Sequence, residues 1–350
     1  MATLPVNQQT TAAAIDRAVV AAASDWRRPH LGASLIGRPC DRELWYSFRW
    51  ATRPDLSGRM LRLFDRGARE EETFARLLRA AGVTVVTVDA KTGQQIRHAE
   101  LSGHFGGSLD AMLRGLIEAP KKWHVGEFKT HNARSFADLT KKGVAEAKPE
   151  HYAQMQCYMR WAQTDRAYYL AVCKDDDQLY DERVEADGAA YLKLLARAER
   201  VIFADTPPAR LSEDPTWYQC KCCDHAPTCH GDQLPEVSCR TCIHATPERD
   251  GDARWSCVRW NADIPVEAQK VGCPEHRYLP ALVPFPAVDA SADDNWIAYQ
   301  LPDGRIVKNG ASSPMSYTSA EWRAGSGAFL GDPGVEALRA TFNATVGEPK

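Results

Sequence analysis

Short apolar stretches mark the strands that the sequence predicts. Val83–Val88 is rich in β-branched residues, and Tyr168–Val172 has the same apolar character. A further apolar run spans His124–Lys129, and Pro120 with its charged neighbours forms a predicted turn just before it. Because residues 101–117 supply another strand before that turn, the two runs predict a hairpin.

Apolar residues at helical spacing predict the helices. In Arg59–Leu78, the residues Leu63, Glu71 and Phe74 share one face. Further helices are predicted within residues 1–30, after Cys40, from Pro149 onward and over 186–203.

The predicted hairpin brings three charged side chains together. Glu127 and Lys129 point to the same face of an extended segment, and Asp110 on the neighbouring strand can reach that face. Two carboxylates and a lysine suit a divalent metal that activates water, and Mg²⁺ takes only one or two protein carboxylates. An ordinary hairpin with a surface ion pair is the alternative.

Composition narrows the class of protein. The 350 residues suggest one large or two to three small domains, and 44% hydrophobic with 25% charged residues is ordinary for a globular protein. The sequence has no apolar run of about eighteen residues and no basic start before its N-terminal alanines, so a cytoplasmic protein without a membrane span is expected. Eleven cysteines in a reducing compartment favour metal sites over disulfides.

Charge is spread unevenly along the chain. A net charge of −3 excludes a protein that coats DNA through its overall charge. Lys121–Lys148, however, holds seven Lys or Arg against three Asp or Glu, next to the predicted metal site. Such a segment can contact DNA phosphates, although a solvated charged face is the alternative. The expected DNA contacts are Lys121, Lys122, Arg134, Lys141 and Lys142.

The first cysteine group is split across the chain. Cys220, Cys223 and Cys229 have C-x2-C-x5-C spacing, and Cys40 stands alone far upstream. Four thiolates suit either tetrahedral Zn²⁺ or an iron–sulfur cluster. Cys222 is an additional cysteine in the same segment and blurs which pair binds.

A second group follows, with five candidate ligands. They are Cys239, Cys242, Cys257, Cys273 and His276. We expect Zn²⁺ on the four cysteines, with His276 as a substitute ligand or as a partner behind the ligands. A segment of about forty residues builds little core alone, so metal binding would supply its folding energy. Trp255 and Trp260 are expected to be core aromatics, with base stacking as the alternative.

Taken in order, these motifs resemble the PD-(D/E)XK nucleases, in particular the RecB-like and phage exonuclease branch. The match is Asp110 followed by Glu127-Phe128-Lys129, and Leu109 stands where the family's name has Pro. The resemblance implies that Asp110, Glu127 and the carbonyl of Phe128 are ligands of Mg²⁺ or Mn²⁺. Lys129 would orient or deprotonate the attacking water.

Two helical motifs extend the resemblance. Gly67 followed by Glu71 is similar to the family's first motif, which implies that Glu71 is a further metal ligand, direct or through water; Glu70 is the second candidate. Gln154 and Tyr158 are similar to the Gln and Tyr that follow the hairpin in related nucleases, where they assist the catalytic Lys.

The first cysteine group resembles that of the iron–sulfur nucleases of the AddB type and of CRISPR adaptation. This resemblance implies a [4Fe–4S] cluster, with Zn²⁺ as the alternative and with Cys222 free. The implied ligands are Cys40, Cys220, Cys223 and Cys229.

The resemblance also implies an α/β fold with a restriction-endonuclease-like core, a central mixed sheet flanked by helices. We expect an N-terminal helix in 1–30 and the core with its four-cysteine cluster in 31–232. A Cys/His zinc module is expected in 236–279 and a Pro/Ala/Asp-rich linker in 280–294. Residues 295–350 are expected to form a small hairpin module around Pro302-Asp303-Gly304.

The implied function is that of a metal-dependent DNA exonuclease that acts on single- or double-stranded ends. Its setting would be DNA recombination, DNA repair or phage DNA processing, and it could act beside a recombination or annealing protein. The alternatives are a structure-specific endonuclease on the same core and a non-catalytic, metal-stabilised DNA-binding adaptor.

Overall fold

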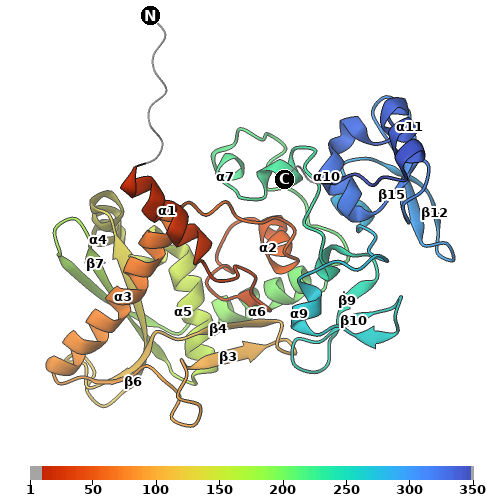
Figure 1. Ribbon diagram of the computed structural model, residues 1–350. Helices are drawn as coiled ribbons and strands as arrows, with labels where there is room; N and C mark the ends of the chain where they lie inside the picture. Colours follow the sequence, from red (N-terminus) through yellow and green to blue (C-terminus); the bar gives the residue numbers. More distant parts are fainter. Residues whose placement is uncertain (1–9, 348–350) are drawn as a thin grey trace, which may run out of the picture.

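The computed structural model describes residues 10–347 and has a mixed five-stranded sheet at its centre (Figure 1). β6 and β7 run parallel, and the other neighbouring pairs of this sheet are antiparallel. In spatial order, the strands are β2 (Thr84–Val86), β5 (Ala111–Arg114), β6 (Trp123–His131), β7 (Arg166–Cys173) and β8 (Leu179–Glu185). The α/β class expected from the sequence is confirmed.

Helices cover both faces of this sheet because the side chains of β6 and β7 alternate between two apolar surfaces. The two covering helices are α3 (Gly58–Ala80) and α5 (Pro149–Trp161). Phe128 packs on Phe74 of α3, with ring centres 5.3 Å apart. Val125 and Tyr169 belong to the core that contains Met155 of α5. Glu127 follows the parity of Val125 and therefore lies on the α5 face.

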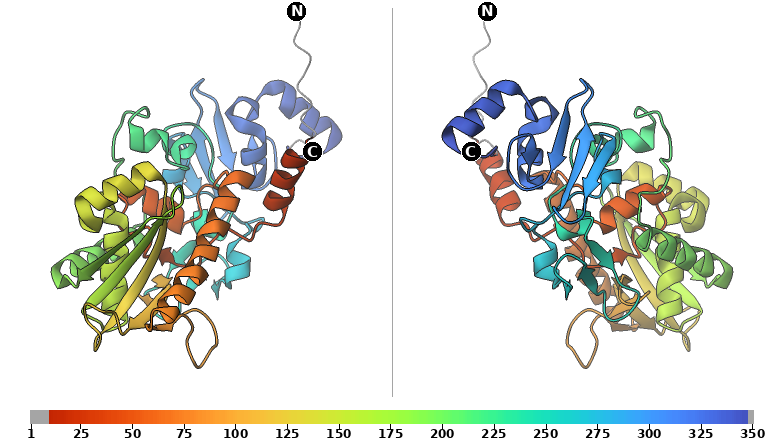
Figure 2. Two further views of the ribbon diagram at one scale, coloured as in Figure 1. Left: turned by 90° about the vertical axis from the view of Figure 1, so that its left-hand side faces the viewer. Right: turned by 90° about the vertical axis from the view of Figure 1, so that its right-hand side faces the viewer.

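Four further helices complete the first part of the chain. They are α1 (Thr11–Ala21), α2 (Asp41–Phe48), α4 (Ala133–Ala147) and α6 (Gly188–Ile202). Figure 2 shows α1 beside the first half of α3. The α2 helix begins at its N-cap Cys40, whose sulfur accepts a hydrogen bond from the Glu43 amide. Among the described residues, no helix is both long enough and apolar enough to cross a membrane.

A small sheet leads the chain into the predicted site. It has the order β1-β4-β3, with β1 (Leu31–Gly32), β4 (Phe105–Ser108) and β3 (Arg97–Glu100). β1 pairs parallel to β4, and β3 pairs antiparallel to it. Because β4 ends just before Asp110, the small sheet fixes where that residue enters the larger one.

Helix α4 and strand β8 are among the elements that were not expected from the sequence. The basic segment contains α4, which buries Phe136, Leu139 and Val144 between its charged residues. Strand β8 follows β7 and pairs with it. It is an edge strand whose residues are mostly polar, so it lacks the apolar pattern on which the expectation relied.

The cysteine-rich segment forms short elements. They are α7 (Tyr218–Lys221), α8 (Ala226–Cys229), η1 (Cys239–Thr241), β9 (Ala245–Pro247), β10 (Trp255–Cys257), β11 (Ala262–Asp263) and α9 (Val266–Gln269). β9, β10 and β11 form an antiparallel sheet with β10 in the middle. Trp255 and Cys242 belong to the same apolar core as α2 and α5, so this segment packs into the central core.

The C-terminal unit has its own core and lies beside the cysteine-rich segment in Figure 1. Tyr299, Tyr317 and Trp322 are fully buried in it. Its elements are η2 (Pro280–Leu282), β12 (Ala287–Ser291), β13 (Trp296–Gln300), β14 (Ile306–Asn309), β15 (Ser316–Tyr317), α10 (Ser319–Phe329) and α11 (Pro333–Phe342).

The expected linker over 280–294 is wrong in its second half. Ala287–Ser291 forms β12, which pairs antiparallel with β13 in a four-stranded sheet. The residues of β12 are small or acidic and mostly exposed, so backbone pairing rather than an apolar pattern places the strand. The expected hairpin is present as β13 and β14, but the unit also contains two helices that were not expected.

Arg240 joins the cysteine-rich segment to the central core. Its guanidinium is fully buried and lies 3.7 Å from the ring centre of Trp50. It donates hydrogen bonds to the carbonyls of Phe48 at 2.8 Å and Pro29 at 2.9 Å, and to the side chain of Gln269 at 3.0 Å. One side chain therefore satisfies acceptors from both sides of the interface.

Arg240→Met is expected to destabilise the protein by about 2–4 kcal/mol. The variant keeps an apolar stem but leaves buried acceptors unpaired, and each such group costs ~1–3 kcal/mol. Urea unfolding measures the change. Arg69→Met, on the exposed surface of α3, is the matched control and should change stability by less than ~1 kcal/mol. Equal stability of both variants would contradict this account of the interface.

Candidate functional site

The Glu127 carboxylate lies at the centre of β6, completely removed from solvent. Lys129, two residues along the same strand, forms an ion pair with it. Apart from this ion pair, neither carboxylate oxygen has a hydrogen-bond partner among the described residues. Burial, the largest cause, and the Asp110 carboxylate together raise the pKa of Glu127 to about 8, against the opposing effect of Lys129.

Asp110 lies beside this pair because of the hairpin register. Ala111 is opposite Gly126, so Asp110 comes next to Glu127 across the two strands. The Phe128 amide donates to Asp110 Oδ2 at 2.8 Å, and Lys129 Nζ lies 3.9 Å from the same oxygen. Lys129 Nζ also donates to the Phe128 carbonyl at 3.2 Å. The Lys129 ammonium therefore contacts all three expected ligand groups of these two strands.

Glu71 lies on α3. Burial, the largest cause, and Asp110 raise the pKa of Glu71 to about 7, and Lys129 opposes them. Both charged residues of the hairpin therefore affect the charge of Glu71, although Glu71 forms no ion pair with Lys129 among the described residues.

Gln154 and Tyr158 approach from α5, and both are buried. Gln154 Nε2 donates to Tyr158 Oη at 3.3 Å. Burial raises the pKa of Tyr158, and Glu127 is the next cause, so the phenol lies near that carboxylate. Gly107 makes room for it, because a Cβ at that position would lie 2.6 Å from Tyr158 Oη. The structure thus brings Asp110, Glu127 and Lys129 into contact and places Gln154 and Tyr158 on the helix that covers the same face of the sheet.

Two histidines next to the site were not among the expected site residues. His131 Nε2 and His151 Nδ1 contact the Tyr169 hydroxyl at 2.8 and 2.9 Å. Burial lowers the pKa of His131 to about 4 and that of His151 to about 3; Lys148 is the next cause for His131, and Lys129 is the next cause for His151. The period-two pattern could have identified His131, because it continues the face of Glu127 and Lys129.

Carboxylate oxygens are suitable ligands for a divalent cation. In the described chain, however, the carboxylates of this site do not converge on one point. Within residues 10–347, no group of three or more His, Cys, Asp or Glu side chains is arranged so that it could hold a metal ion. The cationic ammonium of Lys129 lies between Asp110 and Glu127 instead. Buried, mutually repelling carboxylates with unpaired oxygens fit a hard cation, and the ammonium marks where positive charge is favoured.

The five expected DNA contacts do not form one track. Lys121 and Lys122 precede β6, whereas Arg134, Lys141 and Lys142 lie on α4, which follows it. The nine residues of β6 between them span about 30 Å. Lys142 is also engaged by Asp138 at 2.9 Å. The five residues therefore form two groups, one before β6 and one on α4, and their contact with DNA stays a prediction.

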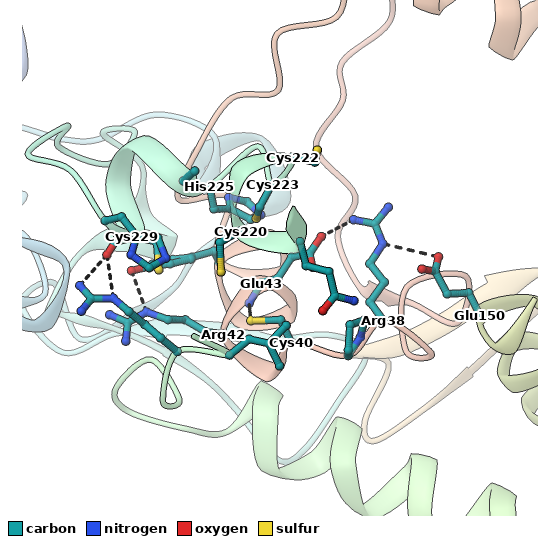
Figure 3. A pocket seen from close by; sticks show the side chains of 17 residues that line it. Arg38, Cys40, Arg42, Glu43, Glu150, Cys220, Cys222, Cys223, His225 and Cys229 are labelled. Atoms are coloured by element: carbon teal, nitrogen blue, oxygen red, sulfur yellow. Dashed lines mark hydrogen bonds and ion pairs between the residues drawn. The ribbon is translucent and has the colours of Figure 1, made fainter. Parts of the chain in front are cut away.

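The first cysteine group lines one cavity of about 260 Å³ (Figure 3). Figure 3 shows the sulfurs of Cys40, Cys220, Cys223 and Cys229 toward the same space, whereas exposed Cys222 points away. The side chains of Arg38, Arg42 and Arg210 line the same cavity. His225 also lines it, and among the described residues its buried Nδ1 has no hydrogen-bond partner. His225 was not among the expected site residues.

The second cysteine group lines another cavity, of about 410 Å³. All four expected cysteines face it, and burial followed by the neighbouring thiols raises the pKa of Cys239. His276 is committed elsewhere: its Nδ1 contacts Ser319 Oγ at 2.8 Å and its Nε2 contacts the Ser238 carbonyl at 3.0 Å. Because both ring nitrogens already have hydrogen-bond partners, these contacts argue against His276 as a substitute ligand.

The two tryptophans of this segment have different environments. Trp255 is fully buried, as expected of a core aromatic. Trp260 is 60% exposed at the rim of the second cavity, so its expected place in the core is wrong.

Comparisons with known proteins give limited similarity. No protein-family model matches the sequence, and no curated protein is significantly similar to it. Among solved structures, the crystal structure of SSO0001 has a TM-score of 0.38 at 12% identity, over 63% of this chain and 96% of that one.

An alkaline exonuclease, LHK-Exo from Laribacter hongkongensis, is also similar. Its crystal structure has a TM-score of 0.32 at 18% identity. The crystal structure of LHK-Exo in complex with dAMP has a TM-score of 0.35 at 20% identity. Each match covers 50% of this chain and 87% of the other. Because these TM-scores and identities are low, the chemistry of the site is inferred from its own geometry and not from these structures.

The two histidines around Tyr169 predict a loss of stability in mild acid. Their pKa values lie below the usual ~6.5, so the folded state favours their neutral forms. This contribution is complete above about pH 6.5 and is lost as the pH falls toward about 4, by at most ~1.4 kcal/mol per pH unit for each proton. Urea unfolding between pH 7 and pH 4.5 measures it.

A His131→Gln/His151→Gln double variant is expected to have a flatter stability profile over this range than the wild type. Other groups titrate equally in both proteins, so the difference isolates the two histidines. Parallel profiles would show that the histidines are not held neutral by the fold.

Proposed function

We propose that this protein is a metal-dependent DNA exonuclease of the PD-(D/E)XK type, in which the five-stranded sheet and its helices form a restriction-endonuclease-like core. The observation that supports it most is the buried Glu127 carboxylate, whose oxygens lack hydrogen-bond partners within the described chain apart from the Lys129 ion pair. Asp110, Glu71, Gln154 and Tyr158 surround it. An ordinary surface ion pair would not require such burial.

The proposed cation ligands are Asp110, Glu127 and the Phe128 carbonyl, with Glu71 as a direct or water-mediated fourth group. When bound, Mg²⁺ or Mn²⁺ would activate water and stabilise the charge that develops on the scissile phosphate. Asp110 is held by the Phe128 amide and Glu127 by its place in the sheet. These carboxylates are thus positioned by backbone structure, as a rigid site requires.

Lys129 is proposed to have two positions. Without the cation its ammonium contacts Asp110, Glu127 and the Phe128 carbonyl. With the cation bound, like charges would repel it toward the reacting phosphate, where the ammonium could orient the attacking water; deprotonation of that water would require the neutral amine form of Lys129. Gln154 and Tyr158, which are hydrogen-bonded to each other on α5, are proposed to assist Lys129.

We propose a [4Fe–4S] cluster on Cys40, Cys220, Cys223 and Cys229, with Zn²⁺ as the alternative. The four thiols line one cavity, and the surrounding guanidinium groups would offset the negative charge of a thiolate-bound cluster. Such a cluster would join the start of α2 to α7 and α8. Its role would be structural, because the proposed hydrolysis has no redox step.

Hydrolysis of end-labelled linear DNA tests the proposed activity. With Mg²⁺ or Mn²⁺, the wild type should release nucleotides from single- or double-stranded ends. Asp110→Asn and Glu127→Gln should each reduce the rate by about 100-fold or more, since a lost metal ligand removes several kcal/mol of transition-state stabilisation. Thermal unfolding checks that each variant folds.

Glu71 and Glu72 provide a matched pair on the same helix. Glu71→Gln should lower the rate, whereas Glu72→Gln, on the exposed side of α3, should not. Cleavage of circular DNA by the wild type would favour the endonuclease. Metal-dependent DNA binding without cleavage of any substrate would favour the adaptor. Wild-type rates for both Asp110→Asn and Glu127→Gln would rule out the proposed site.

Oxygen-free purification tests the proposed cluster. The wild type should be brown and contain iron and sulfide, whereas Cys40→Ser should lose the iron. Cys222→Ser should retain the colour, because this thiol points away from the cavity. A colourless protein with zinc at these cysteines would replace the cluster with a zinc site.

A further inference from the structure

The cavity beside the second cysteine group is separate from the proposed nuclease site. Cys239, Cys242, Cys257 and Cys273 all face it. They come from three separate places in the segment: η1 and the residue after it, β10, and the turn after α9. The register of β9 and β10 explains part of this convergence, because Cys257 lies opposite Ala245, three residues after Cys242.

Two tight turns carry three of these cysteines. Cys239–Cys242 and Cys273–His276 are both tight turns, closed by amide-to-carbonyl hydrogen bonds of 3.1 and 2.9 Å. Two turns of this kind present cysteines on adjacent loops with amides available to stabilise thiolates.

A buried cation next to these thiols lacks a direct anionic partner. Arg277 is 2% exposed, and its guanidinium donates to the carbonyls of Asn295 at 2.6 Å and Pro274 at 2.9 Å. Within residues 10–347, no carboxylate forms an ion pair with it at 4 Å or less. The Ile243 amide donates to the Arg277 carbonyl at 2.8 Å, so the backbone of Arg277 lies beside Cys242.

We propose that Cys239, Cys242, Cys257 and Cys273 bind Zn²⁺ as four thiolates, with Arg277 as the buried counter-cation and without His276 as a ligand. Four thiolates around Zn²⁺ carry a net charge of −2, which gives Arg277 the anionic neighbour that it otherwise lacks. The sulfurs line the cavity without yet forming a coordination shell in the described chain. Side-chain rotation into the cavity closes the shell.

This site would secure both neighbours of the segment. Arg240, between the first two ligands, stacks on Trp50 of the central core. His276, just after the last ligand, contacts Ser319 of α10 in the C-terminal unit. Zinc would therefore fix the turns from which these two contacts extend. Its role is structural, because four cysteines leave no open position for substrate.

Zinc content of the full-length protein tests the proposal. Elemental analysis of the wild type, and of Cys40→Ser, should find one zinc ion per chain that Cys257→Ser and Cys273→Ser each lack. Cys157→Ser, in the buried part of α5, is the matched control and should keep it. His276→Gln should also keep it. Loss of zinc in His276→Gln together with retention in Cys257→Ser would overturn the ligand set.

Two further measurements apply even if a cysteine variant fails to fold. Co²⁺ exchanged into the wild type should give the absorption of a tetrahedral thiolate site, and absence of this absorption would overturn the proposal. Arg277→Met should weaken zinc retention against a chelator by about 10- to 100-fold, as for other groups behind metal ligands. Arg254→Met, on the far edge of β10, should leave it unchanged. Equal retention in both variants would overturn the role of Arg277.

Discussion

Burial of the Glu127 carboxylate is the constraint on which the proposed site depends. Removing a carboxylate from water is unfavourable by several kcal/mol unless other groups compensate for it. Lys129 compensates in part, but Asp110 and Glu71 add like charge nearby. The result is a point of strong negative potential inside a rigid sheet. Such a point favours a cation. The ammonium of Lys129 is the cation at this point in the structure, and a divalent metal ion is proposed to replace it.

The surrounding architecture keeps this point fixed. The register of β5 and β6 sets Asp110 beside Glu127, and the small sheet sets where Asp110 enters. The glycine at position 107 lets Tyr158 approach from α5. Farther away, Arg240 holds the cysteine-rich segment against the core by stacking on Trp50. Metal at either cysteine group would add covalent links to contacts that the apolar core already makes.

The sequence predicted the parts of this arrangement that follow from local periodicity. The alternation of side chains in β6 placed Glu127 and Lys129 on one face, whereas Glu71, Gln154 and Tyr158 were singled out by the resemblance to known nucleases. Elements stabilised by tertiary packing or edge pairing were missed, among them α4 and β12. A linear count of charges did not show that the long strand β6 divides the basic residues into two groups. The role of His276 also could not be read from spacing alone. Its spacing from Cys273 is typical of a metal ligand, but its Nδ1 contacts Ser319 of α10.

Asp110 and Glu127 are proposed to form a divalent cation site. The most direct test is a titration of the protein with Mn²⁺, in which the electron paramagnetic resonance signal of free Mn²⁺ reports what remains unbound. The wild type should remove Mn²⁺ from solution, and a folded Glu127→Gln variant should leave nearly all of it free. Equal binding by the two proteins would contradict the claim, because the buried carboxylate would then have no part in holding the metal.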